Sequence, residues 1–253
     1  MTPRAAAKRK APAEFEPIRV EPAYRKVAAA LLSRITDRSI NAGERLPPET
    51  ELARQFGVHR GTVREALREL ETNGVLKRER GSKLMMVTRP ARNAVAANVS
   101  RALSLHDVSY HDVWEALTAL EPPIAAAAAR ARKAADLARL DRVIAQLEAA
   151  EDTEAAVEQA AAFFRAVGEA THNGVFMLAH EPLVELLVPS LGAMIDKVAQ
   201  ARARISAAQR RIVMAIRDQD AAQAQDWMGK HIRDFRRGFE IARIGLEQRV
   251  RNA

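Results

Sequence analysis

The sequence has no cysteine among its 253 residues, which excludes disulfide bonds, thiolate nucleophiles and cysteine-ligated zinc or iron–sulfur sites. Aromatic residues make up only 4% of the chain and alanine dominates its second half, a composition that favours helices over β-sandwiches or barrels. No apolar run approaches the ~18 residues of a membrane span, and no apolar segment follows the N-terminus as in a secretory signal. We therefore expect a cytoplasmic protein that has no membrane partner.

The excess basic charge is confined to the first third of the chain. The whole sequence has 40 Lys and Arg against 32 Asp and Glu, a formal net charge of +8. Residues 1–92 hold 20 of these cations and 11 of the acids, whereas the remaining residues hold 20 and 21. A small basic module joined to a larger neutral domain indicates a polyanion-binding part and a part with another task, although excess Lys and Arg also serve solubility alone.

Residues 1–22 are predicted to be a disordered basic tail, because four prolines interrupt a stretch that contains four Lys and Arg between Thr2 and Lys10. Such a tail either contacts DNA phosphates or is inert. From Ala23 the pattern changes, since Val27, Leu31 and Ile35 recur every four residues and predict an amphipathic helix that ends at residues 41–43.

Two further helices and a hairpin are predicted next. A short helix over residues 50–56 is followed by Gly57, which allows a left-handed turn, and by a longer helix over residues 59–73. Residues 75–79 and 84–87 are β-type runs around the tip 80–83. This order of elements over residues 23–88 is that of a winged helix-turn-helix. Residues 89–106 are predicted to be a linker with some helical character.

The segment LPPETELARQFGVHRGTVREALRELETNGVL, residues 46–76, resembles the DNA-binding domain of the GntR family of bacterial transcription regulators. That family has the pattern LPSExxLAxx, a hydrophobic residue, then GVSRxxVRxALxxLxxxG. Pro48 and His59 replace its two serines, and Thr50 stands where a basic residue often contacts DNA. The other signature positions match through Leu76.

The first turn of the second helix of a helix-turn-helix faces base edges in the major groove. That turn contains His59, Arg60, Gly61 and Thr62, and Arg64 follows on the same face as Arg60. An arginine can donate two parallel hydrogen bonds to guanine, so we predict that Arg60 and Arg64 contact bases. The alternatives are a phosphate contact for Arg60 and an intrahelical pair of Arg64 with Glu65 or Glu69.

Further DNA contacts are predicted at the edges of this module. Thr62 has a hydroxyl and a methyl that fit a phosphate or a thymine, and Gly61 leaves room for the helix in the groove. Arg54 is a candidate phosphate ligand. At the hairpin tip, Arg80, Gly81 and Lys83 are expected either to approach the minor groove or to form a solvated turn.

Residues 107–253 are predicted to be an all-helical domain, so the fold class is mostly α: a winged helix-turn-helix followed by a helical bundle. Asp152 and Asp220 suit helix N-caps, and Glu121 beside Pro122 is interpreted as a helix-end charge. The predicted helices cover residues 109–132, 135–150, 153–171, 175–203, 206–217 and 220–250.

This region resembles the FCD domain, the all-helical effector domain of the FadR subfamily of GntR regulators. The resemblance rests on Leu120-Glu121-Pro122 before an alanine run, Thr171-His172-Asn173, and Met228 before His231-Ile232. Many FCD domains bind a divalent metal through one Asp and three His. The corresponding positions here are Ala160, Phe164, Gln209 and His231, so we expect no metal and no cofactor, because a single imidazole does not hold a divalent ion.

The resemblance also places an effector pocket in this domain, lined by Leu117, Phe164, Gln209 and His231. Leu117 stands where the family often has a ligand-binding arginine, so an apolar-bodied effector fits better than a small dicarboxylate. Two alternatives are that the pocket has filled and the domain only dimerises, and that His231 is a core histidine.

We therefore expect a homodimeric regulator, more often a repressor in this family, that binds an inverted-repeat operator in double-stranded DNA and responds to a small-molecule effector. The alternative is a nonspecific or architectural DNA-binding protein whose C-terminal domain only dimerises. An enzyme is not expected, because the sequence has no nucleophile–base pair, phosphate loop or paired carboxylates at a plausible site.

Overall fold

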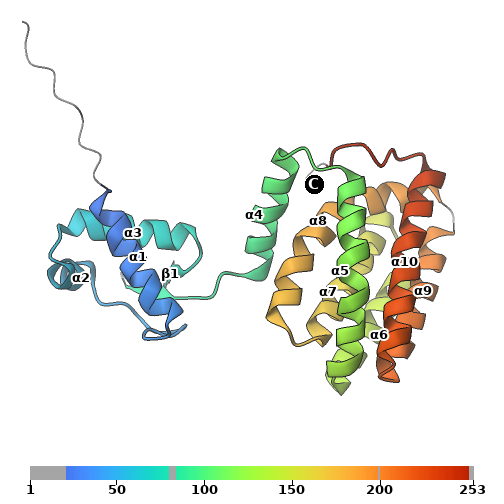
Figure 1. Cartoon of the computed structure of the whole chain (residues 1–253), viewed down its shortest axis with the longest axis horizontal. Coiled ribbons are helices and arrows are strands. Elements are labelled where there is room, and N and C mark those ends of the chain that lie inside the picture. Colours follow the sequence, from blue (N-terminus) through green and yellow to red (C-terminus); the bar gives the residue numbers. More distant parts are fainter. Residues whose placement is uncertain (1–20, 80–83, 199, 251–253) are drawn as a thin grey trace, which may run out of the picture. The chain divides into compact units, whose positions relative to one another are not determined.

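The computed structural model describes residues 21–79, 84–198 and 200–250. Within them the chain divides at Pro90 into two units, each with its own hydrophobic core. Figure 1 traces a small cluster of helices in the first unit and a bundle of helices in the second. The predicted fold class is confirmed.

The first unit is a three-helix cluster with a two-stranded hairpin. Its strands pair antiparallel, with Lys77 opposite Met86. Gly57 has the left-handed conformation that its position between two helices requires, at φ +64°. Helix α1 ends earlier than predicted, at Thr36, because the chain turns at Arg38, which has φ +64°. The elements are α1 (Ala23–Thr36), α2 (Glu49–Phe56), α3 (Arg60–Thr72), β1 (Leu76–Arg78) and β2 (Met85–Val87).

The core of this unit follows the predicted apolar faces. Val63, Ala66, Leu67 and Leu70 of α3 are buried against Val27 and Leu31 of α1 and against the hairpin. Because the buried residues of α3 recur at helical spacing, its opposite face stays at the surface, where Arg60 and Arg64 lie.

The second unit contains seven helices within its described residues. Helix α5 packs most extensively on α10, and α7 packs on α6 and α8. Asp152 and Asp220 are N-caps, as predicted, since their carboxylates accept from the backbone N–H groups of Ala155 and Gln223. The helices are α4 (Arg92–Leu105), α5 (Tyr110–Ala131), α6 (Ala134–Glu148), α7 (Thr153–Ala170), α8 (Gly174–Lys197), α9 (Ala201–Arg217) and α10 (Ala221–Ala242).

Helix α4 occupies most of the segment predicted to be a linker. It belongs to the second unit and packs on α8, with Ala96 and Ser100 buried in the contact. The Ser100 hydroxyl donates to the carbonyl of Pro182 at 3.1 Å and to Glu185 at 2.9 Å. Only residues 88–91 therefore connect β2 to the helical unit.

Two other predicted boundaries were wrong. The break expected at residues 204–205 lies earlier, after Lys197, because the backbone of Val198 is extended and α9 begins at Ala201. Helix α10 ends at Ala242 rather than near residue 250, because Arg243 is left-handed, at φ +55°. The chain beyond it turns back to the start of α5, where Tyr110 N–H donates to the Gln248 carbonyl.

Helix α8 is long and apolar enough to cross a membrane by length and composition alone. Its apolar character has a simpler cause within the bundle, where Val184, Leu186, Leu187 and Leu191 are almost fully buried. The helix packs on α4, α5 and α7.

Candidate DNA-binding surface and effector pocket

Helix α3 begins at an N-cap formed by His59. The Nδ1 atom of its ring accepts a hydrogen bond from the Gly61 N–H at 3.1 Å, as a serine hydroxyl would. A Cβ at position 61 would stand 3.3 Å from this Nδ1 atom, which is a tight contact, so glycine leaves room for the ring. Because a protonated imidazole has no acceptor, the cap exists only in the neutral form of His59.

Arg60 and Arg64 lie together at this helix start, and both bind the carboxylate of Glu49. Arg60 Nε is 2.9 Å from Glu49 Oε2, and Arg64 Nη2 is 3.2 Å from the same oxygen. The side chains of Arg60 and Arg64 are 56% and 46% exposed, whereas that of Glu49 is 19% exposed. Arg64 and then Arg60 lower the pKa of Glu49 through these hydrogen bonds, so Glu49 stays ionised.

The sequence pattern suggested Glu65 or Glu69, and not Glu49, as a possible partner of Arg64. Glu49 is 11 residues from Arg60 and 15 from Arg64 along the chain, so only the packing of α2 against α3 brings the three together.

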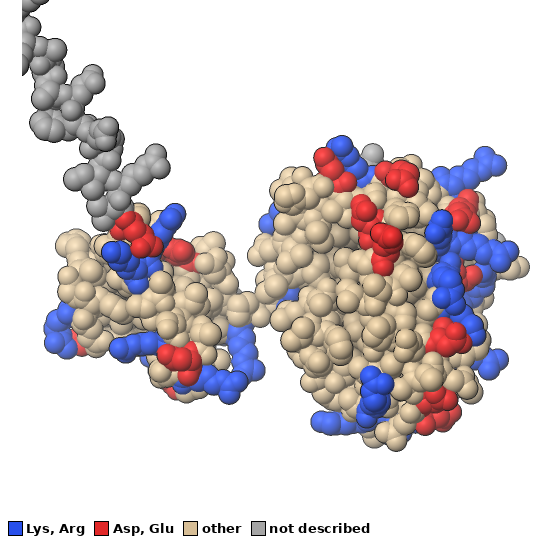
Figure 2. Space-filling model, viewed as in Figure 1, with Lys and Arg blue, Asp and Glu red and all other residues tan. Residues whose placement is uncertain are grey.

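These residues line a hollow of about 570 Å³ on the first unit, which we call the basic hollow. It has four arginines against one glutamate, so its local charge is strongly positive. Arg68 and Arg78 belong to it and were not predicted. Figure 2 shows further basic side chains, with acidic ones among them, at the surface of this unit. The lining residues are Pro48, Glu49, Thr50, Arg60, Arg64, Arg68, Arg78 and Leu84.

The remaining predicted DNA contacts are less well placed or not described. Thr62 is partly exposed beside the basic hollow but does not line it. Arg54 lies outside the hollow and is bound at Nε and Nη2 by Glu51, whose pKa this pair lowers to about 2. Arg80, Gly81 and Lys83 fall outside the described residues.

The four predicted effector residues lie on four different helices of the second unit, and all are buried: Leu117 on α5, Phe164 on α7, Gln209 on α9 and His231 on α10. We call their position the bundle centre. The His231 ring stacks on Phe164 with centroids 5.8 Å apart and lies 4.6 Å from the ring of Phe235. Burial among these rings lowers the pKa of His231 to about 3, so its imidazole is neutral.

Open space at the bundle centre is small. A cavity of about 20 Å³ beside His231 has room for one water molecule. A larger groove of about 380 Å³ reaches His231 from the surface, between Trp227, Lys230 and Arg211. Neither Leu117 nor Phe164 lines this cavity or this groove, and both side chains are almost fully buried in the core.

Two polar side chains at the bundle centre are incompletely bonded. Within the described residues, both amide atoms of Gln209 and the Nε2 atom of His231 are buried without a hydrogen-bond partner. Such atoms cost stability unless water or a ligand supplies the missing bonds.

The metal-binding positions of the related domains do not fit a metal here. Ala160 and Phe164 are fully buried and have no donor atom, and the Phe164 ring stacks on the one remaining histidine. An amide and an imidazole are too few ligands for a divalent ion.

Glu121 is not a helix-end charge, contrary to its interpretation from the sequence. It lies within α5, which continues through Pro122 and Pro123, and it is fully buried. His180 of α8 is also buried and places Nδ1 2.9 Å from Glu121 Oε1. Tertiary packing therefore replaces solvent around this carboxylate. The neighbouring proline in the sequence gives no sign of this burial.

The fold and the basic hollow define a winged helix-turn-helix protein with an all-helical partner domain. The model of the bacterial regulatory proteins of the gntR family matches residues 23–84, and that of the FCD domain matches residues 112–234. Together they cover more than half of the chain. The protein belongs to the gntR family and has the C-terminal FCD domain of the FadR-type arrangement. This family consists of transcription regulators and not of enzymes.

The chain is also similar to individual transcription regulators. The chain is 31% identical over 160 residues to the Uxu operon transcriptional regulator of Escherichia coli K12, covering 61% of this chain and 60% of that protein. It is 24% identical over 236 residues to the Glc operon transcriptional activator of the same strain, covering 90% and 92%. A solved structure titled Streptococcus agalactiae GntR is 25% identical, with a TM-score of 0.61 over 85% of this chain and 99% of that one.

Proposed function

We propose that this protein is a transcription regulator that reads a specific DNA operator with Arg60 and Arg64. The observation that carries the proposal is the shared carboxylate of Glu49, which binds both arginines at the start of the helix that faces the major groove in this fold. Among the described residues, the Nη atoms of Arg60 have no partner, so its terminal edge is free to donate to guanine O6 and N7.

Glu49 has two effects in this mechanism. It holds each guanidinium in one orientation before DNA arrives, which reduces the entropy lost on binding. Its negative charge also repels DNA phosphates. A DNA sequence that offers no guanine at the right place therefore binds with less favourable free energy. Arg68 and Arg78 supply the positive charge of the basic hollow, which favours any DNA backbone.

We infer that the regulator acts as a homodimer on an inverted repeat, in the cytoplasm. Val99 and Leu105 on α4 and Val175 and Leu178 on α8 are exposed apolar side chains on two helices that pack together. A second copy covering this surface would give the two DNA-binding units the symmetry of a palindromic operator.

Repression is the mode of regulation that we propose, with an effector that changes DNA affinity from the bundle centre. The groove that reaches His231 combines the Trp227 ring with the cations of Arg211 and Lys230, so it suits an effector with an apolar body and an anionic group. The unbonded atoms of Gln209 and His231 are the polar groups that such an effector would engage. One relative is named as an activator, so the direction of regulation has to be measured separately.

The alternative is an architectural DNA-binding protein whose second unit only dimerises. One observation favours it: Leu117 and Phe164 fill the bundle centre and leave room for only one water. Such a protein needs the charge of the basic hollow but not the orientation of its arginines.

Selection of genomic DNA fragments on the purified full chain, followed by sequencing, tests the proposal. We expect enrichment of a few inverted repeats. Arg64→Ala should then weaken binding to the selected operator by about 5- to 150-fold and binding to random DNA far less, since a bidentate contact is worth ~1–3 kcal/mol of discrimination. The matched control is Arg34→Ala, because Arg34 is exposed on α1 outside the basic hollow. Equal losses on both DNAs would establish the architectural alternative.

A further inference from the structure

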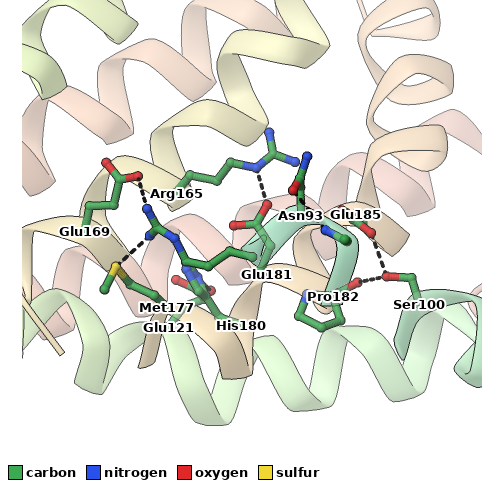
Figure 3. Close-up of polar contacts among 12 residues, drawn as sticks. Asn93, Ser100, Glu121, Arg165, Glu169, Met177, His180, Glu181, Pro182 and Glu185 are labelled. Atoms are coloured by element: carbon green, nitrogen blue, oxygen red, sulfur yellow. Dashed lines mark hydrogen bonds and ion pairs between the residues drawn. The ribbon is translucent and has the colours of Figure 1, made fainter. Parts of the chain in front are cut away.

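A second cavity in the helical unit is separate from the bundle centre and from the basic hollow. Its volume is about 290 Å³, and it lies between α4, α7 and α8. Figure 3 shows residues that α7 and α8 contribute, with Arg165 facing Glu181, and His180 close to Glu121. We call it the α4 cavity, because Arg92 and Asn93 of α4 complete its lining.

Two arginines of the α4 cavity have side-chain N–H donors that are unbonded or weakly bonded. Arg165 binds Glu181 through Nε, and within the described chain its two Nη atoms have no partner. Arg92 Nη1 donates to the sulfur of Met177 at 2.8 Å, and its Nη2 is 3.5 Å from Glu169 Oε1. A thioether is a weak acceptor, so Arg92 is poorly satisfied. Two guanidinium groups with free or weakly used donors at one cavity form a site for a carboxylate.

The third polar group of the α4 cavity is His180, which is only 1% exposed. Its Nδ1 atom faces the Glu121 carboxylate at 2.9 Å, and a carboxylate accepts, so Nδ1 donates. In a neutral imidazole this leaves Nε2 as an acceptor, and no described residue donates to it. The backbone of Gly168 lies against Nε2, and a Cβ at that position would overlap the ring, so α7 is shaped around this imidazole.

We propose that the α4 cavity binds a small carboxylate that has a hydroxyl or amino group next to its carboxyl carbon. The carboxylate would bind Arg92 and Arg165, and the adjacent O–H or N–H would donate to His180 Nε2. Glu169 binds Arg139 as well as Arg92, and Glu181 binds Arg165. The arginines therefore exceed the glutamates by one positive charge, which a monoanion balances better than a dianion such as phosphate. Met177 is the one apolar residue of the lining, so the body of the ligand is short.

One residue of this site is close in the sequence to the boundary between the units. Arg92 begins α4, and the boundary between the units is at Pro90. A carboxylate that draws Arg92 away from Met177 and Glu169 would change the first turn of α4. This consequence rests on the proposed function, because it links ligand binding to DNA affinity, whereas the binding itself does not.

Calorimetric titration of the DNA-free full chain separates the two questions. We expect 2-hydroxybutanoate to bind at millimolar concentrations or below, and butanoate, which lacks only the hydroxyl, to bind about tenfold more weakly. Arg165→Gln should weaken binding of 2-hydroxybutanoate by about 10- to 100-fold, as expected for a charged hydrogen-bond partner. His180→Gln should reduce the difference between the two acids.

Two control variants make the result specific. Arg142→Gln removes an exposed arginine of α6 outside the α4 cavity and should leave binding unchanged. Arg211→Gln alters the groove near His231 and tests whether the acid binds there instead. The proposal fails if neither acid binds the wild-type chain, if phosphate binds more tightly than either, or if Arg211→Gln rather than Arg165→Gln abolishes binding. If the fragment selection showed no DNA binding, these calorimetric results on the DNA-free chain would still decide whether the α4 cavity binds the acid.

Discussion

The two units differ in the exposure and the hydrogen bonding of their polar side chains. In the first unit, Arg60 and Arg64 are half exposed and share the carboxylate of Glu49, so each charge has a partner or solvent. In the second unit, Gln209 and His231 are buried, and no described residue bonds the Gln209 amide or His231 Nε2. A surface that exchanges one partner for DNA is stable without DNA, whereas a core with unbonded polar atoms loses stability in exchange for a place to bind water or a ligand.

The largest effect is expected when a large side chain is removed from the bundle centre. Phe164 is fully buried and stacks on His231, so we expect Phe164→Ala to lower the free energy of unfolding by about 3–5 kcal/mol. Both tryptophans, Trp114 and Trp227, lie in the second unit, so tryptophan fluorescence in a denaturant titration reports its unfolding. The control is Met214→Ala at a 50% exposed position of α9, where we expect a loss below about 1 kcal/mol. Similar losses for the two variants would contradict the packing described.

A pH titration sharpens the comparison, because His231 is neutral in the folded state. Burial lowers its pKa from 6.5 to about 3, so between these values the unfolded chain binds a proton that the folded chain does not. Stability is therefore fully present above pH 6.5 and decreases as the pH falls, with a slope that approaches about 1.4 kcal/mol per pH unit. Denaturant titrations at pH 7 and pH 5 measure this loss.

The variant His231→Gln removes this titrating group and should reduce the loss of stability between pH 7 and pH 5. His106→Gln is the matched control, since His106 is exposed. An unchanged pH dependence in His231→Gln would mean that solvent reaches the imidazole.

The smallest expected effect concerns the helix cap of the first unit. His59→Ala removes the acceptor for the Gly61 N–H, which should destabilise the start of α3 by about 1 kcal/mol. Hydrogen exchange of the amides in the first turn of α3, measured in the full chain, detects this local loss. His59→Ser supplies a hydroxyl acceptor and should restore protection. Equal exchange in the two variants would show that His59 does not act as a cap.

The first unit could be predicted closely because its signals are local. Gly57 and the apolar spacing of Val63, Ala66 and Leu70 place α2 and α3 to within one or two residues. The predicted positions of Arg60 and Arg64 on one face follow from the same periodicity. What could not be predicted was Glu49 as their partner, because nothing in the spacing of α3 indicates which face of α2 packs nearby.

The second unit was harder to predict because alanine-rich helices mark their ends weakly. No glycine or proline separates α8 from α9, so the predicted break was misplaced by several residues. Pro122 suggested a helix end beside Glu121, yet α5 continues, since its neighbours stabilise the helix and His180 partners the carboxylate. The predicted linker had some helical character, and most of it forms α4. Its packing on α8 is a tertiary contact that no local pattern reveals.

The return of the chain after α10 has a practical consequence for handling the protein. The carbonyls of Gln248 and Leu246 accept from the first N–H groups of α5, at Tyr110 and His111, and Val250 N–H donates to Val108. Cleavage after Ala242 would therefore expose the start of the helix that packs most extensively on α10. An affinity tag or fusion partner belongs at the other end of the chain, and protection of residues 244–250 from carboxypeptidase reports an intact bundle.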